Sequence, residues 1–548
     1  MQSTKQELEA ARRGDNMRLR VSELNDRMDR AAQGGGKKRA EAQRKKGKMT
    51  VRERVEALLD KGTERVEIGA LAGDGMYAAD GGCPGGGVVV VIGTVSGAQC
   101  IVVANDATVK AGAWFPITGK KNLRAQELAL ELHLPIVYLV DSAGVFLPMQ
   151  DEIFPDKEHF GRIFRNNAVL SAKGIPQLSA VMGSCVAGGA YLPVMSDECV
   201  IVKGTGSIFL AGPHLVQAAI GEKVDGETLG GALMHTEISG VADHLAEDDA
   251  HAIGILRRLM KQRRNRPTVR NFRRDAPALP KGDANDIMEV LPEERNKPYD
   301  TRNLLNALVD DSDFSEFKKN YGKTIICATA KIDGWSVGIV ANQRMLVKSQ
   351  TAGVQFGGVI YSDSADKAAR FIMNCNQKGL PLVFLQDVTG FMVGSKSEHG
   401  GIIKDGAKMV NAVANSVVPK FTIVVGNSYG AGNYAMCGKA YDPKLIVAWP
   451  TAQLAVMGGN QAADVLMTME KGSLKKRGVE LSAEDEQALR DKITTRYTEQ
   501  TSPYYAAARL WVDAIIDPRD TRKWISEGIR AADGTPDPGP MHVGVLQV

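Results

Sequence analysis

VMGSCVAGGAY (Val181–Tyr191) recurs in modified form as VVGNSYGAGNY (Val424–Tyr434). In each copy an apolar run leads into a glycine-rich turn and then into a segment compatible with a helix. Backbone N–H groups at the start of a helix point outward and carry partial positive charge, and glycines leave them uncovered. Each turn therefore predicts a cradle for an oxyanion. The alternative is that glycine only relieves steric strain at a strand-to-helix corner.

The two stretches belong to a longer internal repeat. Gly183 and Gly426 lie 243 residues apart, Asn105 and Asn342 in VVAND and IVANQ lie 237 apart, and Asp141 and Asp387 in LPIVYLVDSAG and LPLVFLQDVTG lie 246 apart. Aligned blocks in the same order, at nearly constant offsets, indicate duplication of one domain. The repeat is too long for a solenoid unit, so we expect two homologous domains.

Hydrophobic patterning predicts the α/β class for these domains. Short, continuously apolar, β-branched runs alternate with helical segments such as 122–133, which is typical of buried strands joined by crossover helices. The strands expected in the first half are 88–95, 100–104, 136–140 and 178–182.

The first 60 residues are expected to form a separate helical and basic segment. A polar helix over 1–33 is interrupted by Gly34–Gly36, and a second helix over 50–59 begins with Thr50 as its cap. Between them, Lys37–Lys48 holds seven basic side chains, which either form a solvated face or contact phosphate.

A charged, proline-rich segment marks the middle of the chain. Residues 257–274 carry nine basic side chains and several prolines follow, which favours an inter-domain linker over a nucleic-acid site because aromatic residues are nearly absent. The expected domains are 61–275 and 301–548, with the linker at 276–300. A further helix is expected over 502–512, ending before Pro518.

Composition narrows the functional classes. The chain has 548 residues, of which 44% are hydrophobic and 24% charged, and a net charge of +4, which favours a soluble globular protein over a nucleic-acid binder. Its seven cysteines form no CxxC pair, so we expect free thiols and no metal. The first residues lack an apolar signal segment and no apolar run reaches about 18 residues, so a cytoplasmic protein without a membrane span is expected.

Three kinds of chemistry compete for the glycine turns. Gly426–Gly430 fits the G-x-S-x-G pattern of hydrolases, but the only histidine after Ser428 is His542, in a Gly/Pro-rich tail. A dinucleotide site needs a third glycine where Ala435 stands. Enolate chemistry on a thioester needs paired backbone donors, each worth about 3–4 kcal/mol to the oxyanion. Two such turns at matched positions of a duplication favour the enolate.

Several motifs resemble the carboxyltransferase (beta) subunits of the biotin-dependent acyl-CoA carboxylases. They include GKMTVRERVEALLD, FLPMQDEIFPDKEHFGRIF, GSCVAGGAYLPVMSDE, GSIFLAGP, FLQDVTGFMVG, IIKDGAKMV, GNSYGAGNYAMCGKAYDP and VMGGNQAADVL. The resemblance runs from about residue 20 to 530. It implies two homologous crotonase-like (ClpP/crotonase) α/β domains, in agreement with the duplication.

The resemblance also implies an activity and partners. Such a subunit is a ligase component that moves the carboxyl group from carboxybiotin to the α- or γ-carbon of a short acyl-CoA. The sequence holds no biotinylation motif of the A/V-M-K-M type and no ATP-binding pattern, so biotin is expected in trans, on a biotin carboxylase or biotin carboxyl carrier partner. The family forms hexamers, in which the first domain of one protomer faces the second domain of another.

Site residues follow from matching positions. The family's hole for the thioester enolate corresponds to Gly188 and Gly189, and its hole for the biotin ureido oxygen to Gly430, Ala431 and Gly432. Substrate contacts are expected from Arg44, Lys45, Lys46, Lys48, Ala143, Gly144, Ala187 and Tyr191, and biotin-side contacts from Thr389, Gly390, Phe391, Tyr429 and Tyr434.

The expected substrate is of the 3-methylcrotonyl-CoA type. FLPMQDEIFPDKEHFGR supports it, whereas VKSQTAGVQFGGVIYSDSADKAARF is closer to the propionyl-CoA type, and SAGV replaces the usual SGGA at Ser142–Val145. Propionyl-CoA, acetyl-CoA and an acyl-CoA decarboxylase subunit are the alternatives within the family. Outside it, a crotonase-like hydratase or a CoA-binding scaffold remains open.

Overall fold

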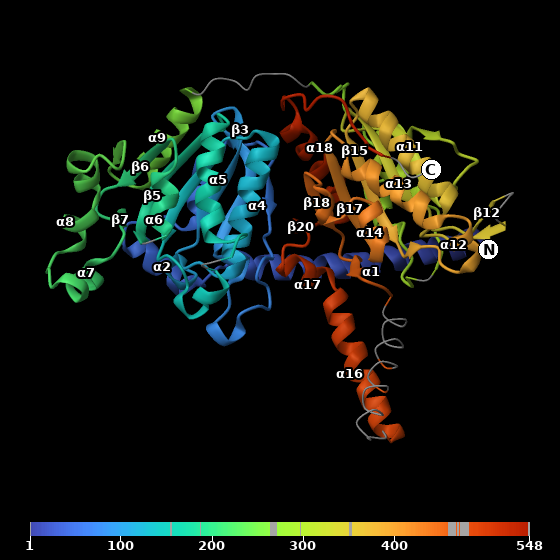
Figure 1. Ribbon diagram of the computed structural model, residues 1–548, viewed down its shortest axis with the longest axis horizontal. Coiled ribbons are helices and arrows are strands. Elements are labelled where there is room, and N and C mark those ends of the chain that lie inside the picture. Colours follow the sequence, from blue (N-terminus) through green and yellow to red (C-terminus); the bar gives the residue numbers. More distant parts are fainter. Residues whose placement is uncertain are drawn as a thin grey trace. The chain divides into compact units, whose positions relative to one another are not determined.

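The computed structural model describes residues 2–153, 156–186, 188–262, 271–295, 297–349, 353–458, 467, 471 and 482–545 (Figure 1). By its internal contacts the chain divides into two compact units. The first unit comprises Asp26–Thr268 and Ala507–Leu510, and the second comprises Met1–Asn25, Val269–Ala506 and Trp511–Val548. The long helix α1 (Gln2–Ala32) contributes residues to both units. The domain boundaries expected from the sequence stay a prediction.

The first unit is built on a mixed sheet with the order β1-β2-β3-β4-β5-β6-β8, and β7 pairs with the end of β5. β1 to β3 are antiparallel, and the later pairs are parallel. The strands are β1 (Val66–Ile68), β2 (Val88–Val95), β3 (Ala98–Asn105), β4 (Ile136–Ser142), β5 (Gln177–Val186), β6 (Glu198–Val202), β7 (Ser207–Phe209) and β8 (His244–Ala246).

Helices cover both faces of this sheet because successive side chains of a buried strand point to opposite faces. Val137 and Leu139 of β4 join the apolar core with α3 and α9, whereas Tyr138 between them accepts a hydrogen bond from Gln126 of α4 at 3.2 Å. The helices are α2 (Lys37–Lys45), α3 (Val51–Leu58), α4 (Pro116–Leu132), α5 (Phe160–Ala172), α6 (Gly188–Val194), α7 (Pro213–Ile220), α8 (Gly226–Gly230) and α9 (Asp249–Gln262), with short turns η1 (Ala78–Asp80), η2 (Pro84–Gly87), η3 (Lys110–Gly112), η4 (Leu147–Glu152) and η5 (Met234–Ile238).

The second unit repeats this sheet as β9-β10-β11-β15-β17-β18-β20, with β19 paired to the end of β17. Its strands are β9 (Phe314–Phe317), β10 (Ile325–Ile332), β11 (Trp335–Asn342), β15 (Leu382–Val388), β17 (Lys420–Tyr429), β18 (Leu445–Ala448), β19 (Gln453–Ala455) and β20 (Ala514–Ile515). Two small ladders pair β12 (Val347–Ser349) with β13 (Gly353–Gln355), and β14 (Val359–Ile360) with β16 (Gly390–Phe391).

The second unit contains its own set of helices. They are α10 (Thr301–Leu308), α11 (Ser362–Lys378), α12 (Ser395–His399), α13 (Ile402–Ala414), α14 (Gly430–Ala435), α16 (Ala483–Thr501), α17 (Pro503–Ala508) and α18 (Thr521–Ala532), with turns η6 (Asp286–Glu289), η7 (Asp310–Ser312), η8 (Lys439–Tyr441) and η9 (Pro518–Asp520). The apolar core includes α11 and α13.

The two sheets confirm the duplication predicted from the sequence. Strand order and polarity are the same, and even an irregularity recurs: the register shifts between Val140 and Ser142 in β4 and between Gln386 and Val388 in β15. The strands and helices expected in the first half, and the helices expected over 1–33 and 50–59, are confirmed. Thr50 caps α3 by accepting a hydrogen bond from the Glu53 N–H.

Two details of the sequence interpretation are wrong. A single helix over 502–512 is not formed: α16 ends at Thr501, α17 spans only Pro503–Ala508, and Leu510 adopts a left-handed φ of 56° that no helix continues. The basic segment from 257 is not a linker from its start, because α9 extends to Gln262. The rest of that segment, residues 263–270, lies outside the described residues. No helix in the described part of the chain is long and apolar enough to cross a membrane.

Candidate functional site

The first glycine corner joins the end of β5 to the start of α6. β5 ends at Val186 and α6 begins at Gly188, whereas Ala187, expected to contact substrate, lies outside the described residues. A Cβ on Gly189 would lie 3.2 Å from Ser142 Oγ, closer than most real contacts. Gly144 has a φ of 86°, and a Cβ there would lie 2.9 Å from the carbonyl oxygen of Val186. The corner therefore tolerates little beyond bare backbone.

The second glycine corner joins β17 to α14 at the matching place. β17 ends at Tyr429 and α14 begins at Gly430, which has a left-handed φ of 54°. A Cβ on Gly432 would lie 2.6 Å from Cγ2 of Val388 and 3.2 Å from Cα of Gly390. Both corners thus form as the sequence predicts, each at a parallel strand's carboxyl end.

What such corners can do follows from their main chain. The first N–H groups of a helix have no acceptor within the helix, and they carry partial positive charge. Glycine leaves no side chain over them, so an oxygen atom of a ligand can approach closely. A developing oxyanion is the group that such fixed donors stabilise best, because they need no reorganisation.

A buried aspartate lies beneath each corner, at the register shift of the strand. The Asp141 N–H donates to Asn105 Oδ1 at 3.3 Å, and the Asp387 N–H donates to Asn342 Oδ1 at 3.1 Å. A Cβ on Gly183 would lie 1.9 Å from Asp141 Oδ1, and one on Gly426 would lie 2.5 Å from Asp387 Cγ. Glycine is therefore required at Gly183 and Gly426, the last residues of VMG and VVG, because a carboxylate occupies the space of a side chain there, which the sequence did not reveal.

Cations from outside the repeat neutralise the first aspartate. Asp141 Oδ2 lies 2.5 Å from Lys48 Nζ and 3.1 Å from Arg54 Nη1, and Arg54 Nε lies 2.8 Å from Asp249 Oδ2. Arg54 also donates to the Met182 carbonyl at 3.0 Å. The network ties α3 and α9 to the strand that leads into the first corner.

The second aspartate has different partners. Asp387 Oδ2 lies 3.3 Å from Arg344 Nε and accepts a hydrogen bond from Tyr299 Oη at 2.9 Å, while Oδ1 accepts one from the Asn427 N–H at 2.9 Å. Burial, with the nearby Asp387 charge, raises the pKa of Tyr299 well above its ordinary value, so the phenol remains a donor.

The hydrolase interpretation of Gly426–Gly430 does not fit the structure. Ser428 is buried, its hydroxyl donates to Gln386 Oε1 at 2.6 Å, and it accepts from Asn433 Nδ2 at 2.7 Å. A nucleophile needs a general base at that hydroxyl, and an amide oxygen is not one. At the matching position of the first unit, burial raises the pKa of Cys185 well above its ordinary value. Ser428 therefore braces the corner.

The basic residues expected to contact substrate differ in accessibility. Lys45 and Lys46 are exposed, and Arg44 donates to Glu53 Oε1 from Nε at 3.0 Å and from Nη2 at 2.8 Å. The Lys48 side chain, by contrast, is only 10% exposed and pairs with Asp141. Lys45 and Lys46 are thus the members of the run most open to a phosphate.

The other predicted substrate contacts lie around the first corner. Ala143 is exposed and its N–H donates to the carbonyl of Ala111 at 3.1 Å. The Tyr191 side chain is exposed and its ring lies 5.4 Å from that of Phe164. An exposed aromatic ring beside bare backbone is suited to contact an acyl chain.

The residues predicted to contact biotin lie around the second corner. The N–H and hydroxyl of Thr389 donate to the Gly358 carbonyl at 2.8 and 3.1 Å, which holds the segment Gly390–Phe391 in the small ladder β14–β16. Tyr429 Oη donates to Gln453 Oε1 at 2.5 Å, and burial raises the pKa of Tyr429 to about 12. Tyr434 is exposed, with its ring 5.9 Å from that of Tyr441.

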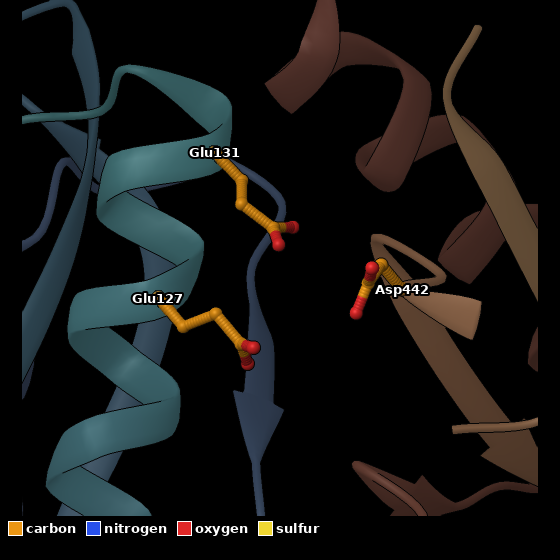
Figure 2. A group of neighbouring side chains, drawn as sticks. All are labelled: Glu127, Glu131 and Asp442. Carbon is orange, nitrogen blue, oxygen red and sulfur yellow. The ribbon is translucent and has the colours of Figure 1, made fainter. Parts of the chain in front are cut away.

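Three acidic side chains away from the corners are drawn in Figure 2. Glu127 and Glu131 lie one turn apart on α4 of the first unit, where Glu127 pairs with Arg124 at 2.5 Å. Asp442 follows η8 in the second unit, with a left-handed φ of 54°. Glu127 and Asp442 are exposed and Glu131 is half-buried, and since acidic groups of this kind are common on protein surfaces, we assign them no metal.

Comparisons with known proteins agree with this geometry. The carboxyl transferase domain family matches residues 42–538. The chain is 50% identical over 509 residues to the biotin-dependent 3-methylcrotonyl-coenzyme A carboxylase beta1 subunit of Mycobacterium tuberculosis, covering 93% of each chain. It is 48% identical to the mitochondrial methylcrotonoyl-CoA carboxylase beta chain of Dictyostelium discoideum, covering 97% of this chain and 88% of that one. The crystal structure of the P. aeruginosa geranyl-CoA carboxylase beta subunit is similar with a TM-score of 0.84 and 36% identity, over 98% of this chain and 97% of the other.

Proposed function

Because this chain belongs to the carboxyl transferase domain family, we propose that it is the carboxyltransferase subunit of a biotin-dependent acyl-CoA carboxylase. The observation that carries the proposal is the pair of bare corners, one at the same strand end of each duplicated sheet. A reaction between an acyl thioester and carboxybiotin has two oxygens on which negative charge develops, so it needs two such corners.

Residues of each unit would stabilise one of these two oxygens. Main-chain N–H groups at Gly188 and Gly189 would hold the thioester oxygen, and those at Ala431 and Gly432 would hold the ureido oxygen of biotin. Bound in trans on a partner subunit, carboxybiotin supplies the activated carboxyl group. Each donor contributes about 3–4 kcal/mol toward the transition state by analogy with other oxyanion holes.

The glycines fit this role because a side chain at either position would block the approach of an oxygen atom to the main-chain donors. A Cβ on Gly432 would lie within 3.2 Å of two residues, and one on Gly189 within 3.2 Å of Ser142 Oγ. The buried aspartates would act as positioning residues, since each fixes the strand just before its corner. Lys45 and Lys46, exposed on the first unit, would contact the phosphates of CoA.

The proposed substrate is a short 3-methyl-2-enoyl-CoA, 3-methylcrotonyl-CoA itself. Two relatives near 50% identity bear its name, and the related solved structure bears the name of geranyl-CoA, which shares the 3-methyl-2-enoyl head on a longer chain. Carboxylation of such a head adds the carboxyl group at the γ-carbon.

The test uses the purified full chain with a biotinylated carboxylase partner, ATP, Mg²⁺ and labelled bicarbonate. The panel contains 3-methylcrotonyl-, geranyl-, propionyl- and acetyl-CoA. We expect label in 3-methylcrotonyl-CoA at the highest kcat/KM. Preference for propionyl- or acetyl-CoA would overturn the substrate, and no incorporation into any thioester would overturn the reaction.

Assembly and location form the remaining part of the proposal. We expect a hexamer, a trimer of dimers, in which corners from two protomers complete each site, and light scattering that shows only monomers would contradict it. A cytoplasmic location is proposed too. The named relatives come from a bacterium and from mitochondria, so cell fractionation is the deciding measurement.

A further inference from the structure

A small cavity of about 40 Å³ lies in the second unit beside β17. Its lining includes three arginines, Arg13 and Arg20 of α1 and Arg295 of the segment before α10. It also includes Gly426 and Asn427, the residues of β17 that precede the second corner. The proposed carboxyl transfer gives these arginines no role.

Each of the three guanidinium groups is held by a neutral acceptor. Arg13 Nε donates to the Glu289 carbonyl at 2.7 Å, and Arg20 Nε donates to Asn16 Oδ1 at 3.1 Å. Arg295 Nη1 donates to the Thr451 carbonyl at 2.7 Å. Within the described residues none of the three arginines forms an ion pair. A guanidinium carries five N–H donors, and each of these three arginines uses only one of them in the hydrogen bonds above, so donors remain for a ligand.

The acidic groups of the cavity do not balance this charge. Asp387 reaches the wall, but its oxygens are engaged by Tyr299, the Asn427 N–H and Arg344. Glu293 also contributes to the lining and is exposed to solvent. The cavity therefore holds an excess of positive charge.

The energetic cost of this arrangement falls on Arg295. Burial lowers the pKa of Arg295 and the charge of Arg20 lowers it further, and the opposing effect of the nearby Asp387 charge does not offset them. Burying a charge without a counter-charge is expensive, and bringing a second like charge close adds to the cost. Such a cluster is stabilised when an anion takes the place of the missing carboxylate.

We propose that the cavity formed by Arg13, Arg20 and Arg295 binds a small oxyanion. Its volume exceeds that needed for one water molecule but is far too small for CoA, so inorganic phosphate and bicarbonate are the ligands of suitable size and charge. The bound oxyanion would tie α1 to the strand that ends at Tyr429, and so would brace the second corner. The site goes beyond the proposed function and does not depend on it.

The test is thermal unfolding of the full chain in sodium chloride that is stepwise replaced by phosphate or by bicarbonate at constant ionic strength and pH. We expect a saturable rise in Tm of about 2 °C or more with at least one of the anions. The rise should vanish in Arg295→Gln and in Arg20→Gln, and persist in Arg12→Gln, which removes an exposed arginine of the same helix. The anion that raises Tm identifies the ligand as phosphate or as bicarbonate.

A second readout separates a ligand site from a structural cluster. In chloride alone, Arg295→Gln should be at least as stable as the parent chain, because a half-buried charge without an ion-pair partner among the described residues has been removed. Titration calorimetry with the active anion should show one site per chain in the parent and in Arg12→Gln and none in Arg20→Gln, which keeps the test open if Arg295→Gln fails to fold. No saturable rise with either anion, or a rise that survives in Arg20→Gln, would overturn the proposal.

Discussion

Replacing Gly432 with alanine tests whether the second corner must stay bare. The new Cβ would lie 2.6 Å from Val388 Cγ2 and 3.2 Å from Gly390 Cα. Carbon atoms in contact prefer about 3.5–4.0 Å, so the corner has to move by roughly 1 Å. Val388 is fully buried and β-branched, so its side chain cannot rotate away freely.

The magnitude follows from that displacement. Overpacking of this kind costs about 1–3 kcal/mol of stability. Loss of one aligned oxyanion donor lowers kcat by about 10²–10³. We therefore expect Gly432→Ala to remain folded and to carboxylate 3-methylcrotonyl-CoA at about one hundredth of the parent kcat or less, while the KM for the acyl-CoA, which the first unit is proposed to bind, changes little.

The assay is incorporation of labelled bicarbonate with saturating partner, beside calorimetric Tm. Gly254→Ala serves as the matched control, because Gly254 lies in α9 and an added Cβ there meets nothing within 4 Å. That variant should keep full activity and gain slightly in stability, since alanine favours a helix. A Gly432→Ala enzyme with parental kcat would refute the assigned role, and equal loss in both variants would show that the assay reports a general defect.

Four further tests, with five variants, give distinct outcomes. Ser428→Ala should lower stability by about 1–3 kcal/mol but kcat by less than about tenfold, whereas loss of a true nucleophile would cost about 10⁴-fold or more; steady-state kinetics decide. Burial lowers the pKa of Lys121 to about 8. Between pH 8 and the ordinary lysine pKa near 10.4, the unfolded chain therefore binds one more proton than the folded chain, and the free energy of unfolding should rise with pH. Urea titrations should show a rise on the order of 3 kcal/mol relative to Lys121→Met. Arg54→Met should cost about 3–5 kcal/mol, because buried Asp249 loses its ion-pair partner and buried Asp141 keeps only Lys48, and a smaller shift in the urea midpoint would contradict the network. Lys46→Met should raise the KM for acyl-CoA up to about fivefold without changing Tm, whereas Lys48→Met should chiefly lower Tm, and the reverse pattern would show that Lys48 is the phosphate contact.

The fold was predictable because the pattern is repeated. Apolar runs before Gly183 and Gly426 indicated buried strands, and constant offsets tied them to the strands that bear Asp141 and Asp387. Each block supported the others, so duplication and α/β class followed from residues alone. The helix expected over 502–512 was predicted too long because a single residue decides its end: Pro503 is tolerated as the first residue of α17, but Leu510 is left-handed and the helix stops at Ala508.

The partners of the aspartates could not be predicted. Arg54 and Asp141 are 87 positions apart, and neither residue type in its local sequence indicates the other. Composition describes the basic run Lys37–Lys48 only as a whole. It therefore cannot show that the Lys48 side chain turns inward while its neighbours stay exposed. Arg13 and Arg20 likewise belong to a polar helix in sequence, and only packing against β17 reveals the cavity.

Two lysines at matched positions of the repeat are a sequence signal from which buried structural residues could have been predicted. Lys121 Nζ donates to the carbonyls of Gly85 and Val88 at 2.8 and 2.6 Å, and Lys367 Nζ to those of Gly322 and Ile325 at 3.5 and 2.8 Å. The two lysines lie 246 positions apart, the same offset as the aspartates. Charged residues retained at matched positions of an apolar repeat are thus a marker of buried structural roles.

The reverse half-reaction tests most directly whether both corners serve one carboxyl transfer. The carboxylated product of 3-methylcrotonyl-CoA, labelled in its new carboxyl group, is incubated with the full chain and free biotin, without ATP or a partner. We predict that label passes to biotin with the parent chain and that Gly189→Ala and Gly432→Ala each lower the rate by about 10²-fold or more. Transfer at the parental rate in either variant, or no transfer with the parent chain, would contradict the account.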